Sequence, residues 1–267
     1  MRSKYSIRAL LAFTLVVAYA TSCLAQASTA DAVDALADRY MEGFKQRFPL
    51  HYEASGLPST KRDSLRINRP ADLEAWWAIV ASMQAEADAI DAHAIQGRPE
   101  WFTLAILKQA LVQERAKQTC RTHLWEIKTI AWQLLLGQFA ELQTVGDATS
   151  RAQIISRYSR LPEFANQEIE NLREGLRLGF SAPRSAVKAV VQQMDSLLAQ
   201  PLMQSTYFSP AERDDDESFK RAWTQVVNTK IEPALLRYRD FLRDEYLPKA
   251  RTAPGIGANP DGALCDR

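Results

Sequence analysis

The sequence predicts an all-α protein, an irregular multi-helix bundle that ends in one long, kinked helix. Apolar residues recur at spacings of three and four along most of the 267 residues, which is the period of a helix with one buried face. No stretch of four to eight residues alternates apolar and polar side chains as a half-buried strand does. The composition, 46% hydrophobic and 24% charged, is that of a globular protein large enough to bury a core.

Segment 1–25 has the pattern of a signal peptide. Three basic residues, Arg2, Lys4 and Arg8, precede an apolar run over 9–20. The run is shorter than the roughly 20 residues that a membrane-spanning helix needs. We therefore expect export to the periplasm or the medium, and no membrane span in the mature chain.

Two kinds of processing fit the end of this segment. Cleavage after Ala25 or Ala27 follows small residues, and Ala25 to Ala27 match the A-x-A pattern. Alternatively, Cys23 becomes the lipidated first residue of a lipoprotein, and the chain carries a lipid anchor.

The net charge and the small numbers of His and Cys residues exclude several kinds of function. Loss of the three leading basic residues leaves 30 basic against 32 acidic residues, a net charge of −2, so we expect no nucleic-acid partner. Three His and three Cys are too few for a metal cage built from those ligands.

Four helical stripes are predicted in the first half of the mature chain. The first covers 29–47, the second begins at Pro70 and the third at Pro99, because Pro favours the first turn of a helix. The fourth runs over 124–142, and the third and fourth are either continuous or kinked near Cys120. The inward residues are expected to be Val33, Leu36, Tyr40, Phe44, Leu73, Trp77, Val80, Ala87, Ile90, Leu104, Leu107, Leu111, Leu124, Ile127, Ala131, Leu135, Phe139 and Leu142.

The second half of the mature chain is also predicted to be helical. Further helices are predicted over 149–161, 162–178, 183–199 and 215–250. Pro233 should kink or split the last one near 229–232, because it lacks the amide hydrogen that the helix ladder uses. We find no linker, so 29–251 is predicted to be one helical domain.

Two segments lack helical periodicity. Segment 48–69 is predicted to be a loop, and a loop of that length in a compact domain is usually functional or mobile. Adjacent Trp76 and Trp77 cannot both face one core, so one of them is expected to pack under this loop or against material absent from this chain. The tail over 252–267 is rich in turn residues and ends as if truncated.

Cys120, His123 and Glu126 lie close enough in sequence to suggest a metal site or a thiol nucleophile. Zinc requires at least three protein ligands, and His51 and His93 have no neighbours at ligand spacing. The sequence also lacks HExxH, phosphate-binding and G-x-S-x-G motifs. We therefore assign no catalytic, cofactor-binding or metal-binding residue, and interpret the three as a polar helix surface beside a structural Cys.

Two charged runs are interpreted as structural. Acidic residues 214–217 stand where a helix begins and are expected to cap it. The mixed run over 237–246 is interpreted as a solvated helix face, with Tyr238 and Leu242 inward and Asp240 paired with Arg243.

Five segments together resemble the N-terminal half of the bacterial domain-of-unknown-function family 885. They are GRPEWFTLAILKQAL (97–111), CRTHLWEIKTIAWQLLLGQFAELQTVG (120–146), NLREGLRLGFSAPRSAVKAVVQQMDSLLA (171–199), YRDFLRDEYLPKAR (238–251) and NPDGALC (259–265). The resemblance implies a largely helical, exported protein. It also implies a zinc metallopeptidase-like activity whose HExxH-like motif lies in a C-terminal half, and no residue of this sequence matches that motif.

Two functions follow from the resemblance. In the first, the chain is the N-terminal helical portion of an exported metallopeptidase-like hydrolase, inactive alone, with no cofactor of its own. Its partner is then the missing catalytic half, or the chain self-associates. In the alternative, it is a free-standing exported helical binding module without catalytic activity.

A disulfide between Cys120 and Cys265 is expected. Export places the chain in an oxidising compartment, and removal or lipidation of Cys23 leaves these two cysteines as a pair. Both lie in segments that carry the resemblance.

Overall fold

The computed structural model describes residues 28–57 and 62–265, and their regular structure is helical. No strand occurs among these residues, and the one isolated bridge joins Pro183 to Arg251. The predicted all-α class is confirmed. None of the helices in the described ranges is long and apolar enough to cross a membrane.

The chain divides into two compact units. The first unit holds the described residues up to Gly43 together with Trp77–Arg115, and the second holds Phe44–Trp76 together with Ala116–Arg267. Each boundary lies inside a helix of the chain, at residues with no linker composition. Composition alone therefore gives no sign of the division.

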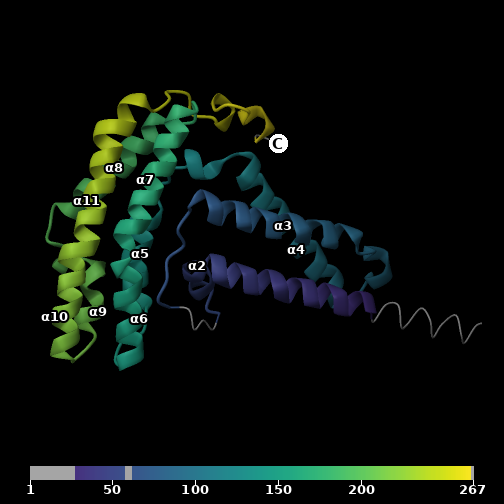
Figure 1. Ribbon diagram of the computed structural model, residues 1–267, viewed down its shortest axis with the longest axis horizontal. Coiled ribbons are helices and arrows are strands. Elements are labelled where there is room, and N and C mark those ends of the chain that lie inside the picture. The colour runs from purple at the N-terminus through teal and green to yellow at the C-terminus, as the bar shows by residue number, and fades with distance from the viewer. Residues whose placement is uncertain (1–27, 58–61, 266–267) are drawn as a thin grey trace, which may run out of the picture. The chain divides into compact units, whose positions relative to one another are not determined.

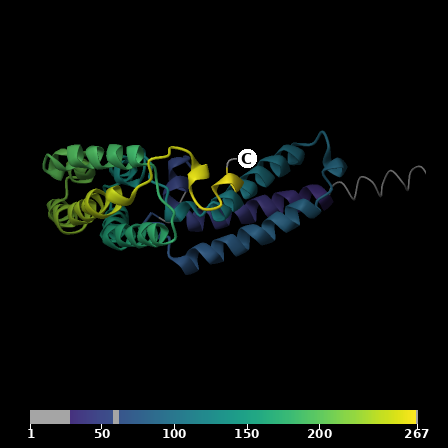
Figure 2. The same cartoon turned by 90° about the horizontal axis from the view of Figure 1, so that it is seen from above.

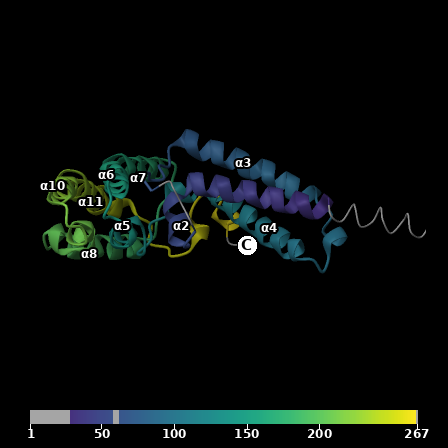
Figure 3. The same cartoon turned by 90° about the horizontal axis from the view of Figure 1, so that it is seen from below.

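The first unit is built from three helical segments. They belong to a helix over 28–47, to α3 (Pro70–Ala89) and to α4 (Pro99–Thr119), and a short turn at Ala92–Ile95 connects the last two. The three lie side by side (Figures 1, 2 and 3). Their facing sides bury the apolar residues Val33, Leu36, Tyr40, Val80, Met83, Ala87, Leu104, Leu107 and Leu111.

The second unit contains the remaining helices. They are α2 (Pro49–Ala54), α5 (Trp132–Leu142), α6 (Ala148–Ser159), α7 (Leu161–Arg177), α8 (Arg184–Leu198), α9 (Ser209–Glu212), α10 (Glu217–Val226) and α11 (Glu232–Asp240). The predicted helices over 149–161, 162–178 and 183–199 are confirmed as α6, α7 and α8. Asp216 caps α10 by accepting hydrogen bonds from the amides of Ser218 and Phe219, as expected for the acidic run.

The predicted long C-terminal helix is present, and its regular α-helical geometry is interrupted near the position where Pro233 was expected to kink or split it. A π-helical turn at Val227–Ile231 separates α10 from α11. Pro233 cannot donate a hydrogen bond to the preceding turn, so the regular ladder changes there. A second π-helical turn covers Phe241–Tyr246, and a 3₁₀ turn ends the helix at Leu247–Lys249.

Aromatic side chains lie at the centre of the core of the second unit. Trp223 and Tyr158 are fully buried, with ring centroids 5.1 Å apart. The Tyr158 hydroxyl donates to the Leu136 carbonyl at 2.6 Å, and the Trp223 indole donates to the Tyr207 carbonyl at 3.0 Å. Both of these buried donors are therefore satisfied, which avoids the cost of leaving them unpaired.

The predicted helix over 124–142 is wrong in its first half. Helix α4 ends at Thr119, Arg121 adopts a left-handed conformation with φ of 47°, and α5 begins only at Trp132. Leu142, predicted inward, is 75% exposed. The buried face of α5 instead includes Gly137, where a Cβ atom would lie 2.4 Å from the Thr206 hydroxyl oxygen. The apolar stripe misleads because the buried face of α5 includes Gly137 and the polar Gln133, which apolar periodicity does not mark.

The inward tryptophan of α3 is Trp76 and not the predicted Trp77. The Trp76 ring packs edge-on against Phe48 with centroids 5.5 Å apart, while Trp77 is only partly buried. The expectation that one of the pair packs against segment 48–69 is confirmed. That segment is also not simply a loop, because it contains α2.

A buried arginine holds segment 48–69 in place. The fully buried Arg157 of α6 pairs with Glu53 at 3.0 Å and donates to the Ser64 carbonyl at 3.2 Å. It also donates to the Gln143 side chain at 2.6 Å. A single guanidinium group thus fixes both ends of the stretch between residues 53 and 64.

Candidate functional site

Cys120, His123 and Glu126 do not form one site. Cys120 is joined to Cys265, and Glu126 pairs with Lys128 at 2.9 Å. His123 lies in the 3₁₀ turn Thr122–Leu124, where burial, followed by the nearby positive charge of Arg121, lowers its pKa to about 4. The three side chains therefore serve separate structural roles.

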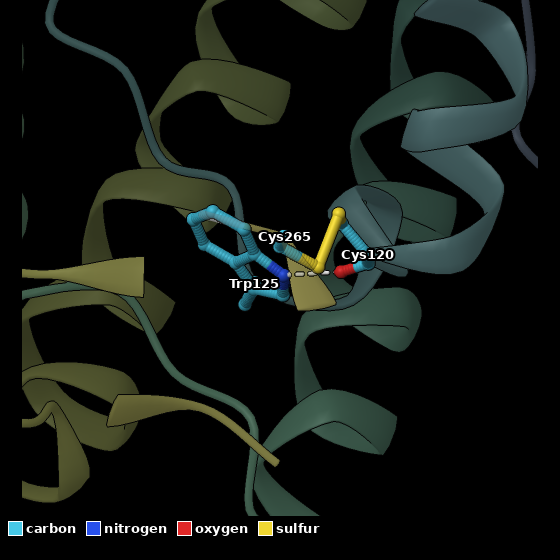
Figure 4. The surroundings of a disulfide bond; sticks show 3 residues. All are labelled: Cys120, Trp125 and Cys265. Atoms are coloured by element: carbon cyan, nitrogen blue, oxygen red, sulfur yellow. Dashed lines mark hydrogen bonds between the residues drawn. A yellow bond between two sulfur atoms is a disulfide. The ribbon is translucent and has the colours of Figure 1, made fainter. Parts of the chain in front are cut away.

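The disulfide lies at the centre of a compact junction. The Cα atoms of Cys120 and Cys265 are 5.7 Å apart, within the range that a disulfide needs. The indole of Trp125 donates to the Cys120 carbonyl at 2.8 Å, and Figure 4 shows its ring beside the sulfur pair. The guanidinium group of Arg251 lies 5.5 Å from the centroid of the same ring. We call this region, formed by residues 120–126, 175–184 and 251–265, the disulfide junction.

Close backbone contact positions the 120–126 segment of the junction. Gly175 of α7 faces Leu124, and a Cβ atom at Gly175 would come within 1.8 Å of the Leu124 carbonyl oxygen. The left-handed Arg121 turns the chain out of α4, and its guanidinium group lies 5.5 Å from the centre of the Phe180 ring. Only glycine at 175 permits this approach.

Hydrogen bonds fasten the tail to the start of α8. The Ser181 amide donates to the Asn259 side chain at 3.0 Å, and the Arg184 amide donates to the Arg251 carbonyl at 2.7 Å. The tail is turn-rich, as expected, with 3₁₀ turns at Ile256–Ala258 and Gly262–Leu264. The junction therefore joins four of the five segments on which the family resemblance rests.

A polar cluster that the sequence did not indicate surrounds Glu168 of α7. The Asn68 side-chain amide donates to its carboxylate at 2.8 Å, and Arg47 donates to Asn68 at 2.8 Å. Burial raises the pKa of Glu168, although Arg66 and the hydrogen bond from Asn68 act in the opposite direction. A raised pKa suits a general acid, but the carboxylate here binds a neighbouring segment. The cluster ties residues 66–68 to α7, and no spacing rule links position 68 to position 168.

A charged groove with a volume of about 420 Å³ lies between α7 and the 237–245 stretch. Arg173 forms two hydrogen bonds with Glu245, at 2.9 and 2.7 Å, and lies over the Phe241 ring. Asp240 pairs with Arg243 at 3.1 Å, and Tyr238 and Leu242 face inward, all as predicted. The residues that line the groove are Asn166, Ile169, Glu170, Arg173, Arg237, Asp240, Phe241, Asp244 and Glu245. Its rim thus presents carboxylates and guanidinium groups together.

The processing predictions at Cys23, Ala25 and Ala27 lie outside the described residues.

Comparison with known proteins identifies the family and the fold. The family model described as "Bacterial protein of unknown function (DUF885)" matches residues 49–263. A crystal structure from Colwellia psychrerythraea, described as a "putative lipoprotein", superposes with a TM-score of 0.70 at 13% identity, over 87% of this chain and 44% of that chain. The match therefore covers less than half of that protein. No curated protein sequence matches it.

Proposed function

The chain belongs to the DUF885 family of bacterial proteins, and from that premise we propose that it is the helical N-terminal portion of an exported, metallopeptidase-like hydrolase. In this proposal it supplies a helical wall beside the reaction site and no metal ligand. The catalytic residues and the zinc ion that the family resemblance implies belong to the part of the larger fold that this chain does not cover.

The observation that carries this proposal is the partial coverage of the larger fold. Residues of this chain reproduce 44% of the Colwellia protein with a TM-score of 0.70. A continuous portion of a larger fold is expected to meet the rest of that fold through part of its surface.

The described residues do not fit a zinc site. Within 28–57 and 62–265, no three His, Cys, Asp or Glu side chains are placed to hold a metal ion. Cys120 is used in the disulfide, and the lowered pKa of His123 reflects a ring embedded among other side chains. We therefore assign no step of a metal-dependent reaction to this chain.

The disulfide junction supports the export part of the proposal. Structural disulfides persist in the periplasm and outside the cell, where thiols are oxidised. The Colwellia protein is described as a "putative lipoprotein", which agrees with export and favours the route through Cys23.

The charged groove favours a second candidate function, that of a binding module without catalytic activity. Its rim combines Arg173 and Arg237 with Glu170, Asp240 and Asp244 over an apolar floor that includes Phe241. Such a groove suits a small ligand that carries both charges. Calorimetric titration of the exported chain with zwitterionic amino acids and dipeptides tests this candidate.

The experiment that tests the main proposal uses the exported chain and the genomic region that encodes it. Reading the downstream DNA in all frames for an HExxH-encoding segment supplies the partner half to co-express. We expect a one-to-one complex with chelator-sensitive peptidase activity, and neither tight zinc binding nor turnover by the chain alone. Turnover or tight one-to-one zinc binding by the chain alone would contradict the proposal.

A further inference from the structure

The tail of the second unit folds around the guanidinium group of Arg251. This group donates to the carbonyls of Ala253 and Gly255, at 3.1 and 3.2 Å. It also donates to the side-chain oxygen of Asn259 at 3.3 Å. All three acceptors are neutral. Burial lowers the pKa of Arg251, and only the Tyr246 hydroxyl acts in the opposite direction, so the cation lies partly out of water without a compensating carboxylate.

Two N–H groups of Arg251 remain for a further acceptor. A guanidinium group carries five N–H donors in a planar fork. The three hydrogen bonds use the Nε donor and one donor on each terminal nitrogen, which leaves one N–H on each terminal nitrogen. The ring of Trp125, 5.5 Å away, lies against the guanidinium group. A further acceptor is therefore expected to approach in the plane of the fork, which suits an anion.

Asn259 brings a buried N–H donor to the same place. Its side chain is buried, and its oxygen accepts from the Ser181 amide at 3.0 Å as well as from Arg251, which fixes the orientation of the amide group. The amide nitrogen is bonded to the same carbon as that oxygen, so it lies next to the Arg251 contact. This nitrogen is buried and has no hydrogen-bond partner among the described residues. In folded proteins such a donor usually marks a bound water or ion.

The surroundings of Asn259 favour an anion over a water molecule. The backbone amide of Arg184 donates to the Arg251 carbonyl, and the Arg184 guanidinium group donates to the Pro248 carbonyl at 3.1 Å. Within the described part of the chain, neither arginine forms an ion pair, and Asp261 does not pair with either of them. Two guanidinium groups with neutral partners give the region a positive potential, which attracts anions.

We propose that Arg251 and Asn259 bind one small monovalent anion, either a chloride ion or a carboxylate of the size of formate. The anion accepts hydrogen bonds from the Asn259 amide nitrogen and from a terminal nitrogen of Arg251, and it balances the guanidinium charge. The residues of this chain already bury the amide nitrogen, so the site admits a small ion and not the surface of another protein. The proposal does not depend on the hydrolase function.

Thermal unfolding at constant ionic strength tests the proposal. The exported chain is measured in sodium gluconate, whose anion is too bulky for the site, and the gluconate is then replaced by chloride or formate. An anion that binds only the folded state should raise the Tm by roughly 3 to 5 °C for each tenfold rise in concentration above its Kd. Stabilisation by chloride, by formate or by both supports the site and identifies its ligand. An equal Tm in all three salts would assign the amide to a bound water and overturn the proposal.

Asn259→Asp replaces the amide nitrogen with a carboxylate oxygen and so supplies the negative charge from the chain itself. It keeps an oxygen for the Ser181 amide and for Arg251. This variant should be at least as stable as the wild type in gluconate, and its Tm should not respond to chloride or formate. The matched control is Asn228→Asp, the same change at an exposed position of the second unit, which should keep the full response. A response that persists in Asn259→Asp would place the anion elsewhere and contradict the proposal.

A second measurement needs no variant that alters the tail. If chloride is the ligand, the wild type should broaden the chlorine NMR signal of a sodium chloride solution, and the broadening should decrease as a competing anion fills the site. If formate is the ligand, the formate proton signal should broaden instead. Circular dichroism shows whether Asn259→Asp and Asn228→Asp remain helical. Absence of broadening in both signals, over the concentrations that raise the Tm, would also overturn the proposal.

Discussion

Gly175 and Leu124 approach so closely that only a hydrogen atom fits between the Gly175 Cα and the Leu124 backbone. A Cβ atom at position 175 would lie 1.8 Å from the Leu124 carbonyl oxygen and 2.7 Å from its carbonyl carbon. The contact joins α7 to the turn that follows α4. It therefore determines where Cys120 and Trp125 can lie.

Gly175→Ala should lower the free energy of unfolding by at least about 2 kcal/mol, because the new methyl group meets backbone atoms that cannot rotate away. Urea denaturation followed by circular dichroism measures the change. Gly257→Ala is the matched control, since a Cβ atom there meets nothing within 4 Å. Equal stability of the two variants would show that the 120–126 segment moves freely.

The second prediction concerns the disulfide. The bond between Cys120 and Cys265 closes a loop with a sequence separation of 145. On the chain-entropy model, the double variant Cys120→Ser/Cys265→Ser should lose about 4 to 5 kcal/mol of unfolding free energy. With an excess of reductant, the wild type and the double variant should become nearly equal in stability. Mass spectrometry that finds two free thiols in protein purified from the periplasm would contradict this prediction.

The sequence predicts most helices of the second unit because each has one continuous apolar face. Helix α7 buries Phe164, Ile169 and Leu172 against a single core, so the helical period is visible in the residues themselves. The same reasoning fails at 124–131, where apolar residues pack around a turn. There the left-handed conformation of Arg121 and the absence of a side chain at Gly175 determine the path of the chain. Neither feature produces a periodic sequence pattern.

Of the candidate sites, one could be predicted from the sequence and another could not. Given export and the removal or lipidation of Cys23, the count of cysteines is enough to pair Cys120 with Cys265 in the sequence. The Glu168 cluster, in contrast, depends on Asn68 being folded back against α7 across 100 residues of chain. Contacts of that kind come from tertiary packing, and a single sequence does not reveal them.

His123 should make the protein less stable as the pH falls from about 6.5 to about 4. Burial lowers the pKa of His123 to about 4, whereas the unfolded chain titrates near 6.5. Between these values the unfolded state binds the additional proton, so stability declines with falling pH. After allowance for the partly exposed ring, the loss should be on the order of 1 to 2 kcal/mol.

Denaturation curves across this pH range measure the effect. His123→Gln should remove this contribution, because the neutral amide does not titrate. His93→Gln, at an exposed position of the first unit, should keep it. An identical pH dependence in wild type and His123→Gln would show that the ring is protonated without cost.

Arg157→Met should destabilise the second unit and release segment 48–69. The substitution removes the 3.0 Å ion pair with Glu53 and the hydrogen bonds to the Ser64 carbonyl and the Gln143 side chain. Breaking a buried ion pair from one side typically costs about 3 to 5 kcal/mol, and the lower end applies here because Arg62 remains 3.3 Å from Glu53. Chemical denaturation measures the loss, and limited proteolysis should show faster cleavage between residues 53 and 64.

Two further variants separate charge from packing at Arg157. Glu53→Gln added to Arg157→Met should recover part of the stability, because it removes a partly buried carboxylate that has lost Arg157 and keeps only Arg62 as an ion-pair partner. Arg160→Met changes an exposed arginine that pairs with Glu163 at 3.5 Å, so it should leave the denaturation midpoint nearly unchanged. If Arg157→Met proved as mild as Arg160→Met, the path of segment 48–69 would depend on its apolar contacts, such as that between Phe48 and Trp76, and not on the buried guanidinium group.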